Sequence, residues 1–175
     1  MIPEGPLVTA TRTSLVLAIA LTAQITVASR IEVFEVRGDL MLLIAVAAGL
    51  AAGPDRGAVV GFAAGISFDL LLQSPFGLSA LTYALVAYVA GSLQDSVLRA
   101  SWWIPVATAA TASTLGVILY GVFGSVVGED LLGLPLLRIA LVVGVLNAVA
   151  APAVLRIVRW AITPAIGVRP RLMTR

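Results

Sequence analysis

The chain has 175 residues, of which 60% are hydrophobic and 11% charged, and its mean hydropathy is +1.07. Roughly a quarter of the residues in soluble domains are charged, so we expect lipid to surround most of this surface. Cysteine, histidine and lysine are all absent. This excludes thiolate nucleophiles, imidazole acid–base chemistry, Schiff-base lysines and the usual zinc or haem ligands. The composition therefore favours a noncatalytic membrane protein that holds no metal and no cofactor.

Six apolar stretches follow one another, separated by segments that contain Arg, Asp, Glu, Gly or Pro. The connections are too short to hold a second folded unit, so residues 1–175 are expected to form a single all-α integral membrane domain, a bundle of six transmembrane helices. The first stretch ends in Ala28 and Ser29, as a signal peptide would, but the five further stretches favour an uncleaved helix. The expected spans are 14–29, 40–53, 57–72, 78–93, 104–127 and 135–157.

The second stretch, 40–53, is about 21 Å long if it is helical, whereas the hydrocarbon core is roughly 30 Å thick. One interpretation is a re-entrant segment. The other is a tight hairpin of the second and third helices, because Asp39 can cap the first turn of the second helix. Gly53, Pro54 and Asp55 then supply a turn and a cap for the third helix. We favour the hairpin.

The arginines predict the orientation of the bundle. With six spans and an internal N-terminus, most of them lie on the cytoplasmic side, so both termini are expected in the cytoplasm and the loop 30–39 outside. Trp102, Trp103 and Trp160 are expected at the inner headgroup level, where the C-terminal arginines can bind anionic lipids. The inner arginines are Arg12, Arg56, Arg99, Arg156, Arg159, Arg169, Arg171 and Arg175, and the outer ones are Arg30, Arg37 and Arg138.

Glycines recur at every fourth position through the second stretch, its turn and the third stretch: Gly49, Gly53, Gly57, Gly61 and Gly65. Missing side chains let helices approach closely and gain dispersion contacts. Packing inside this protein, within the hairpin, is the favoured interpretation. The alternative is a face that docks a partner helix.

Asp69 continues the four-residue spacing from Gly65 and lies near the outer end of the third helix. A carboxylate within a span costs on the order of 2.5–3.5 kcal/mol at the bilayer centre, and a helix C-terminus does not favour negative charge. A specific donor is therefore expected, so that Asp69 is a structural carboxylate holding the turn into the fourth helix. The candidate donors are Gln73, Ser74, the backbone amides of the turn Pro75-Phe76-Gly77, and Arg138.

Asn147 and Pro152 share the sixth helix. Asn147 can offer its amide to a neighbouring helix, and Pro152 can free a carbonyl and bend the segment. Both are interpreted as packing features. Asp69 and Asn147 lie on different helices without a nucleophile–base spacing, which argues against a membrane enzyme.

Residues 39–93 resemble the rod shape-determining protein MreD family of bacteria. The resembling features are Gly38-Asp39-Leu40, Arg56-Gly57 with Gly61-Phe62 and Gly65, then Phe68-Asp69-Leu70-Leu71, Phe76-Gly77-Leu78-Ser79-Ala80-Leu81, and Asn147-Ala148-Val149-Ala150-Ala151-Pro152 in the last helix. The family often has proline where this chain has Gly38.

The resemblance implies a noncatalytic inner-membrane scaffold subunit of the cell-elongation machinery. Its partners would be the bitopic protein MreC and, through it, a SEDS glycosyltransferase with a class B penicillin-binding protein, with MreB on the cytoplasmic side. The family is also similar in fold to the S-components of energy-coupling-factor vitamin transporters, which supplies a rival function. An S-component needs a polar, aromatic pocket near the outer face, whereas the outer loops, apart from 30–39, are short and nearly bare of hydrogen-bonding groups.

Overall fold

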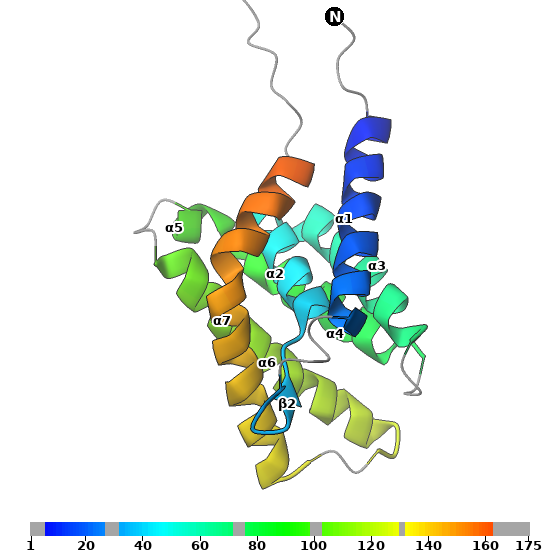
Figure 1. The fold of residues 1–175 in the computed structure, drawn as a ribbon, viewed down its shortest axis with the longest axis vertical. Helices are drawn as coiled ribbons and strands as arrows, with labels where there is room; N and C mark the ends of the chain where they lie inside the picture. Colours follow the sequence, from blue (N-terminus) through cyan, green and yellow to red (C-terminus); the bar gives the residue numbers. More distant parts are fainter. Residues whose placement is uncertain (1–5, 27–31, 72–75, 99–102, 130–131, 163–175) are drawn as a thin grey trace, which may run out of the picture.

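A computed structural model describes residues 6–26, 32–71, 76–98, 103–129 and 132–162. Helices make up most of these residues (Figure 1). The elements are α1 (Pro6–Thr26), β1 (Glu32–Val33), β2 (Val36–Arg37), α2 (Leu40–Ala52), α3 (Pro54–Asp69), α4 (Leu78–Ser92), α5 (Gln94–Leu98), α6 (Ile104–Val126) and α7 (Leu134–Ile162).

Three described helices are long and apolar enough to cross a membrane: α1, α6 and α7. Two more, α2 and α4, are apolar but shorter. Each of the six expected stretches corresponds to one helix, namely α1, α2, α3, α4, α6 or α7, but only α1, α6 and α7 are long enough to cross a membrane, so six spans stay a prediction. The ends of the helices also differ from the expected ones. The first helix begins at Pro6 instead of residue 14, and the last continues to Ile162 instead of ending at 157. The short helix α5 and the β1–β2 hairpin were not expected from the hydropathy pattern.

Helix α2 lies at the centre of the bundle, and every residue from Met41 to Leu50 is buried. It packs against α1, α3, α4, α6 and α7. A helix that is apolar on all sides is stable only when other elements surround it, which explains why this segment has no polar face. Its 13 residues can be shorter than a lipid-exposed span because other helices surround its sides.

The connection between α2 and α3 is a tight turn at Gly53. Its N–H donates to the carbonyl of Gly49 at 2.9 Å, and its φ of 85° lies in the region that favours glycine. Pro54 then occupies the first turn of α3, where its missing N–H costs nothing. The two helices therefore form the expected hairpin. The expected capping role of Asp55 was wrong: Gly53 occupies the cap position, no side chain caps α3, and Asp55 lies exposed in the first turn.

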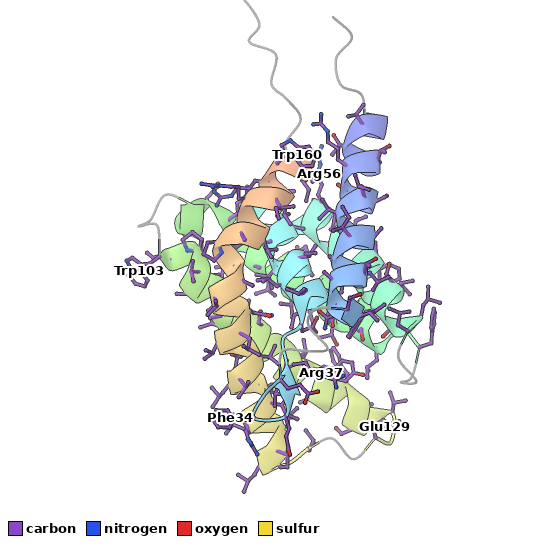
Figure 2. The ribbon with its side chains drawn as sticks, viewed as in Figure 1. Phe34, Arg37, Arg56, Trp103, Glu129 and Trp160 are labelled. Atoms are coloured by element: carbon purple, nitrogen blue, oxygen red, sulfur yellow. The ribbon has the colours of Figure 1, made fainter. Side chains whose placement is uncertain are left out.

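The start of α1 and the end of α7 lie at the same end of the molecule (Figure 1). The Arg12 guanidinium lies 5.2 Å from the centre of the Trp160 ring, which is cation–π distance. In Figure 2, Arg56 and Trp160 lie at this end, whereas Phe34, Arg37 and Glu129 lie toward the opposite end. We call the first of these the terminal end and the second the hairpin end.

The β1–β2 hairpin has a two-residue turn in which Phe34 and Glu35 both have positive φ, of 55° and 66°. Such turns normally use Asn and Gly. Contacts with α7 hold this one, since Arg138 donates to the Phe34 carbonyl at 3.2 Å and its guanidinium lies 5.7 Å from the Phe34 ring centre.

Candidate functional site

Asp39 caps the first turn of α2 through its side chain. One carboxylate oxygen, Oδ1, accepts a hydrogen bond from the Leu42 N–H at 2.9 Å. The other, Oδ2, accepts from the hydroxyl of Tyr83 on α4. Burial raises the pKa of the Asp39 carboxyl group, although both hydrogen bonds oppose the shift. The cap was readable from the sequence because it is local, but the tyrosine partner was not.

Asn147 on α7 connects three elements. Its amide nitrogen donates to the backbone carbonyl of Asp39 at 3.0 Å and to the hydroxyl of Ser113 on α6 at 2.9 Å. Asn147 and Ser113 are both buried. The amide therefore holds α6 and α7 against the start of α2, as the expected interhelical role requires. Ser113 was missed, although a serine inside an apolar span is a signal for such a contact.

Gln24, near the end of α1, binds the same segment from the other side. Its Nε2 donates to the Gly38 carbonyl, and its Oε1 accepts from the Leu40 N–H, both at 2.9 Å. The backbone of residues 38–40 is therefore hydrogen-bonded to side chains of both α1 and α7. The Asp39 side chain is hydrogen-bonded to α4. Sequence reasoning did not single out Gln24, whose only signal is a polar side chain in an apolar helix.

Asp69 is buried at the end of α3 and holds the beginning of α4. Its Oδ2 accepts from the N–H groups of Gly77 at 2.9 Å and Ala80 at 3.2 Å, and its Oδ1 accepts from Ser79 at 3.1 Å. These amides belong to the N-terminus of α4, where the helix dipole favours a negative charge. The unfavourable dipole at the end of α3 is therefore opposed by the favourable dipole at the start of α4, which the sequence argument did not consider.

The expected donors to Asp69 fall into three groups. Gly77 is one of the actual donors, whereas Ser79 and Ala80 were missed. Arg138 was a wrong candidate, since it binds the Phe34 carbonyl at the hairpin instead. Phe76 was also a wrong candidate, since the described donors to Asp69 are Gly77, Ser79 and Ala80. Gln73, Ser74 and Pro75 lie outside the described residues.

The glycine face of α3, formed by Gly57, Gly61 and Gly65, packs inside the protein, but mostly not within the hairpin. A Cβ at Gly57 would lie 2.5 Å from the Cα of Gly49 on α2, as expected for a hairpin contact. At Gly61, however, it would lie 2.6 Å from the carbonyl oxygen of Tyr83 on α4, and at Gly65 it would overlap the backbone of Ala80. Gly61 and Gly65 therefore contact α4. Gly49 of α2 also faces α4, since a Cβ there would lie 2.2 Å from the Ala87 carbonyl oxygen.

Pro152 lies inside α7, which continues as a helix on both sides of it, and its ring is exposed. It therefore does not end the helix, and it is not part of the buried contacts described above. The C-terminal residues Arg169, Arg171 and Arg175, expected to bind lipid, lie outside the described part of the chain, as does Trp102.

A cavity of about 500 Å³ lies beside Asp39. We call it the Asp39 pocket. Its polar lining residues come from the segments just described, and three aromatic rings and several aliphatic side chains complete the wall. The lining residues are Gln24, Ile25, Arg37, Gly38, Asp39, Leu42, Phe68, Leu71, Tyr83, Gly116, Val117, Tyr120, Ile139 and Val143.

These helices and contacts define a multi-pass α-helical membrane protein in which the side chains of Asp39, Asp69 and Asn147 bind helix ends and backbone segments to one another. Within the described residues, no cluster of three or more acidic side chains could hold a metal ion. The chain belongs to the rod shape-determining protein MreD family, whose model matches residues 7–127. No curated protein and no solved structure matches the chain.

The family match extends from α1 to the end of α6 and therefore includes Asp39, Asp69 and the glycine face. It does not include α7, so the resemblance noted at Asn147 and Pro152 lies outside the matched region. The similarity to S-components stays a prediction, because no solved structure supports it.

Proposed function

We propose that this protein is a noncatalytic scaffold subunit of the bacterial cell-elongation complex, bound to an MreC-like bitopic protein in the inner membrane. Through that partner it regulates peptidoglycan synthesis by a SEDS glycosyltransferase and a class B penicillin-binding protein, with MreB on the cytoplasmic side. The observation that carries the proposal is the family match over residues 7–127, which implies a role in rod shape determination.

The polar side chains inside the bundle make structural hydrogen bonds, which supports a scaffold function. The side chains of Asp39, Asp69 and Asn147 bind backbone groups. A catalytic site instead needs a nucleophile and a base within reach of each other and of a substrate. Carboxylates that cap helices and an amide that joins helices stabilise a rigid platform on which other proteins can assemble.

The topology in this proposal has six passes and two cytoplasmic termini. The common location of the α1 start and the α7 end supports an even number of crossings (Figure 1). Arg56 and Trp160 lie at the terminal end (Figure 2), where positive charge and an indole ring are favoured on the cytoplasmic face. The β1–β2 hairpin would then face outward.

A bitopic partner needs a surface other than the glycine face, which α4 occupies. A groove of about 740 Å³ between α1 and α3 offers one. Its wall includes the small or hydroxyl-bearing residues Ala10, Thr13, Ser14 and Ala63, which allow another helix to approach closely. Only 6% of the apolar part of α1 is buried inside the protein, so most of this helix is open to lipid or to a partner. We place the single transmembrane helix of the MreC-like protein here.

Co-purification from native membranes tests the function. We expect an MreC-like bitopic protein to be recovered with the wild-type chain. Ala63→Leu should reduce that recovery because leucine fills the groove, while the thermal stability of the isolated protein stays unchanged. Leu81→Ala, on the exposed face of α4, is the matched control and should leave recovery intact. Recovery of an ATPase with a vitamin, and no bitopic protein, would replace the scaffold with a transporter.

One observation favours that second candidate, an S-component of a vitamin transporter. The loop 30–39 was the one outer loop expected to carry hydrogen-bonding groups, and the Asp39 pocket combines its Arg37 and Asp39 with the aromatic rings of Phe68, Tyr83 and Tyr120. Vitamin binding to the purified protein would support this candidate. The family match favours the scaffold, so it stays the main proposal.

A further inference from the structure

The Asp39 pocket contains a carboxylate with unused acceptor capacity. Oδ1 of Asp39 accepts a hydrogen bond from Leu42 and Oδ2 accepts one from Tyr83, and the Met41 N–H also interacts with the carboxylate. An ionised carboxylate has about four lone-pair sites, so one remains. The described residues give Asp39 no salt bridge, and its capping role keeps it in place. A cationic donor in the pocket would use this site and offset the cost of burying the charge.

A guanidinium lines the same pocket. Arg37 donates from Nε to Glu32 at 2.7 Å and from Nη2 to the same carboxylate oxygen. This pairing uses two of the five guanidinium N–H groups, so three remain as possible donors to a phosphate oxygen. The pocket therefore presents an anionic and a cationic side chain that are two residues apart in sequence, which suits a zwitterion with an ammonium and a phosphate.

The rest of the wall suits hydrocarbon. Ile25 is 53% exposed, Leu71 49% and Ile139 39%, so the rim of the pocket reaches the apolar surface of the bundle. The interior is different, because Tyr83 is only 3% exposed. A ligand that places a polar head inside and apolar chains across the rim would match both regions.

We propose that the Asp39 pocket binds the headgroup of an aminophospholipid such as phosphatidylethanolamine. The ammonium group donates to the Asp39 carboxylate, the phosphate accepts from Arg37, and the acyl chains cross the rim formed by Ile25, Leu71 and Ile139. A quaternary choline has no N–H to donate to Asp39, and a phosphatidylglycerol has no cation to pair with it. Both should therefore bind more weakly.

Native mass spectrometry of the purified protein tests the proposal with defined lipids. Short-chain phosphatidylethanolamine, phosphatidylcholine and phosphatidylglycerol are added separately, with soluble phosphoethanolamine as a fourth arm. We expect phosphatidylethanolamine to be retained at least tenfold better than the other two lipids, because it alone satisfies both charges. Equal retention of phosphatidylcholine would overturn the proposal. Phosphoethanolamine that binds as tightly as the lipid would support the headgroup chemistry but overturn the membrane source.

Two variants keep the test independent of folding. Asp39→Asn retains a good capping side chain while it removes the charge. Tyr120→Phe removes a hydroxyl from the lining of the pocket that makes no hydrogen bond within the described part of the chain. Asp39→Asn should lower lipid retention by about tenfold, since a charged hydrogen bond is lost. Asp95→Asn, an exposed carboxylate away from the pocket, is the control for charge alone and should bind normally.

The outcomes for the variants are separable. Loss of retention in Asp39→Asn with an unchanged melting temperature supports the pocket, and a smaller loss in Tyr120→Phe would add its hydroxyl to the site. Unchanged retention in Asp39→Asn would show that the lipid binds elsewhere on the surface. If no arm binds above background, the pocket holds water only and the proposal fails, whereas the scaffold function would be unaffected.

Discussion

Asn147 on α7 donates a hydrogen bond to the backbone carbonyl of Asp39, which lies 108 residues earlier in the chain. The same amide nitrogen binds the Ser113 hydroxyl. One buried side chain thus joins the last helix to the start of the central helix and to α6.

We predict that Asn147→Leu destabilises the protein by about 1–3 kcal/mol, because it removes the donor to the buried Ser113 hydroxyl and to the Asp39 carbonyl. Ser113→Ala should cost less, since Asn147 then keeps its bond to Asp39. The melting temperature of the detergent-purified protein measures both effects. Thr111→Ala, an exposed hydroxyl on α6, is the matched control. Equal melting temperatures for Asn147→Leu and this control would contradict the structural role.

For Asp69, we predict that Asp69→Asn is tolerated better than Asp69→Leu, although both destabilise the turn into α4. Asparagine keeps one acceptor oxygen and leucine keeps none, whereas three backbone amides need partners. The expected cost of each lost bond is about 1–3 kcal/mol. Thermal unfolding would report it, and Asp55→Asn, an exposed carboxylate in α3, should change little. If both Asp69 variants folded normally but equally abolished cell-shape function, a proton-dependent role would be the better account.

Gly61→Leu should lower the stability of the isolated protein by about 1–3 kcal/mol or more, because a side chain cannot fit against the Tyr83 carbonyl without moving α3 from α4. Ala63→Leu places the same side chain on the exposed face of the same helix and should leave the melting temperature unchanged. The pair separates internal packing from partner docking. A Gly61→Leu protein with wild-type stability and wild-type partner recovery would refute the close contact.

The proposed topology predicts opposite accessibility for two engineered cysteines, which is a clean test because the native chain has none. Glu35→Cys, at the hairpin end, should react with an impermeant thiol reagent from outside intact cells. Asp55→Cys, at the first turn of α3, should react only after the membrane is opened. Both side chains replaced are exposed. Labelling of Glu35→Cys from the cytoplasmic side alone would reverse the orientation.

Sequence by itself determined the membrane class of this protein and most helix positions, because the mean hydropathy of a segment depends only on the residues within that segment. It also indicated the Asp39 cap and the turn at Gly53, where the donor, the acceptor and the special backbone angle lie within a few residues. For Asp69 it indicated a structural carboxylate, and one of the suggested donors, Gly77, was correct. These features depend on local chemistry.

Only the tertiary structure decided which helices meet. A four-residue glycine spacing indicates close approach, but it does not say whether the neighbour of Gly61 is α2 or α4, since either backbone can fill the space. The hydrogen bond from Asn147 to Asp39 and the pocket beside Asp39 likewise require helices distant in sequence to converge. Within an apolar bundle many helix pairings bury similar surfaces, so the full set of buried contacts selects one arrangement, and no single segment specifies it.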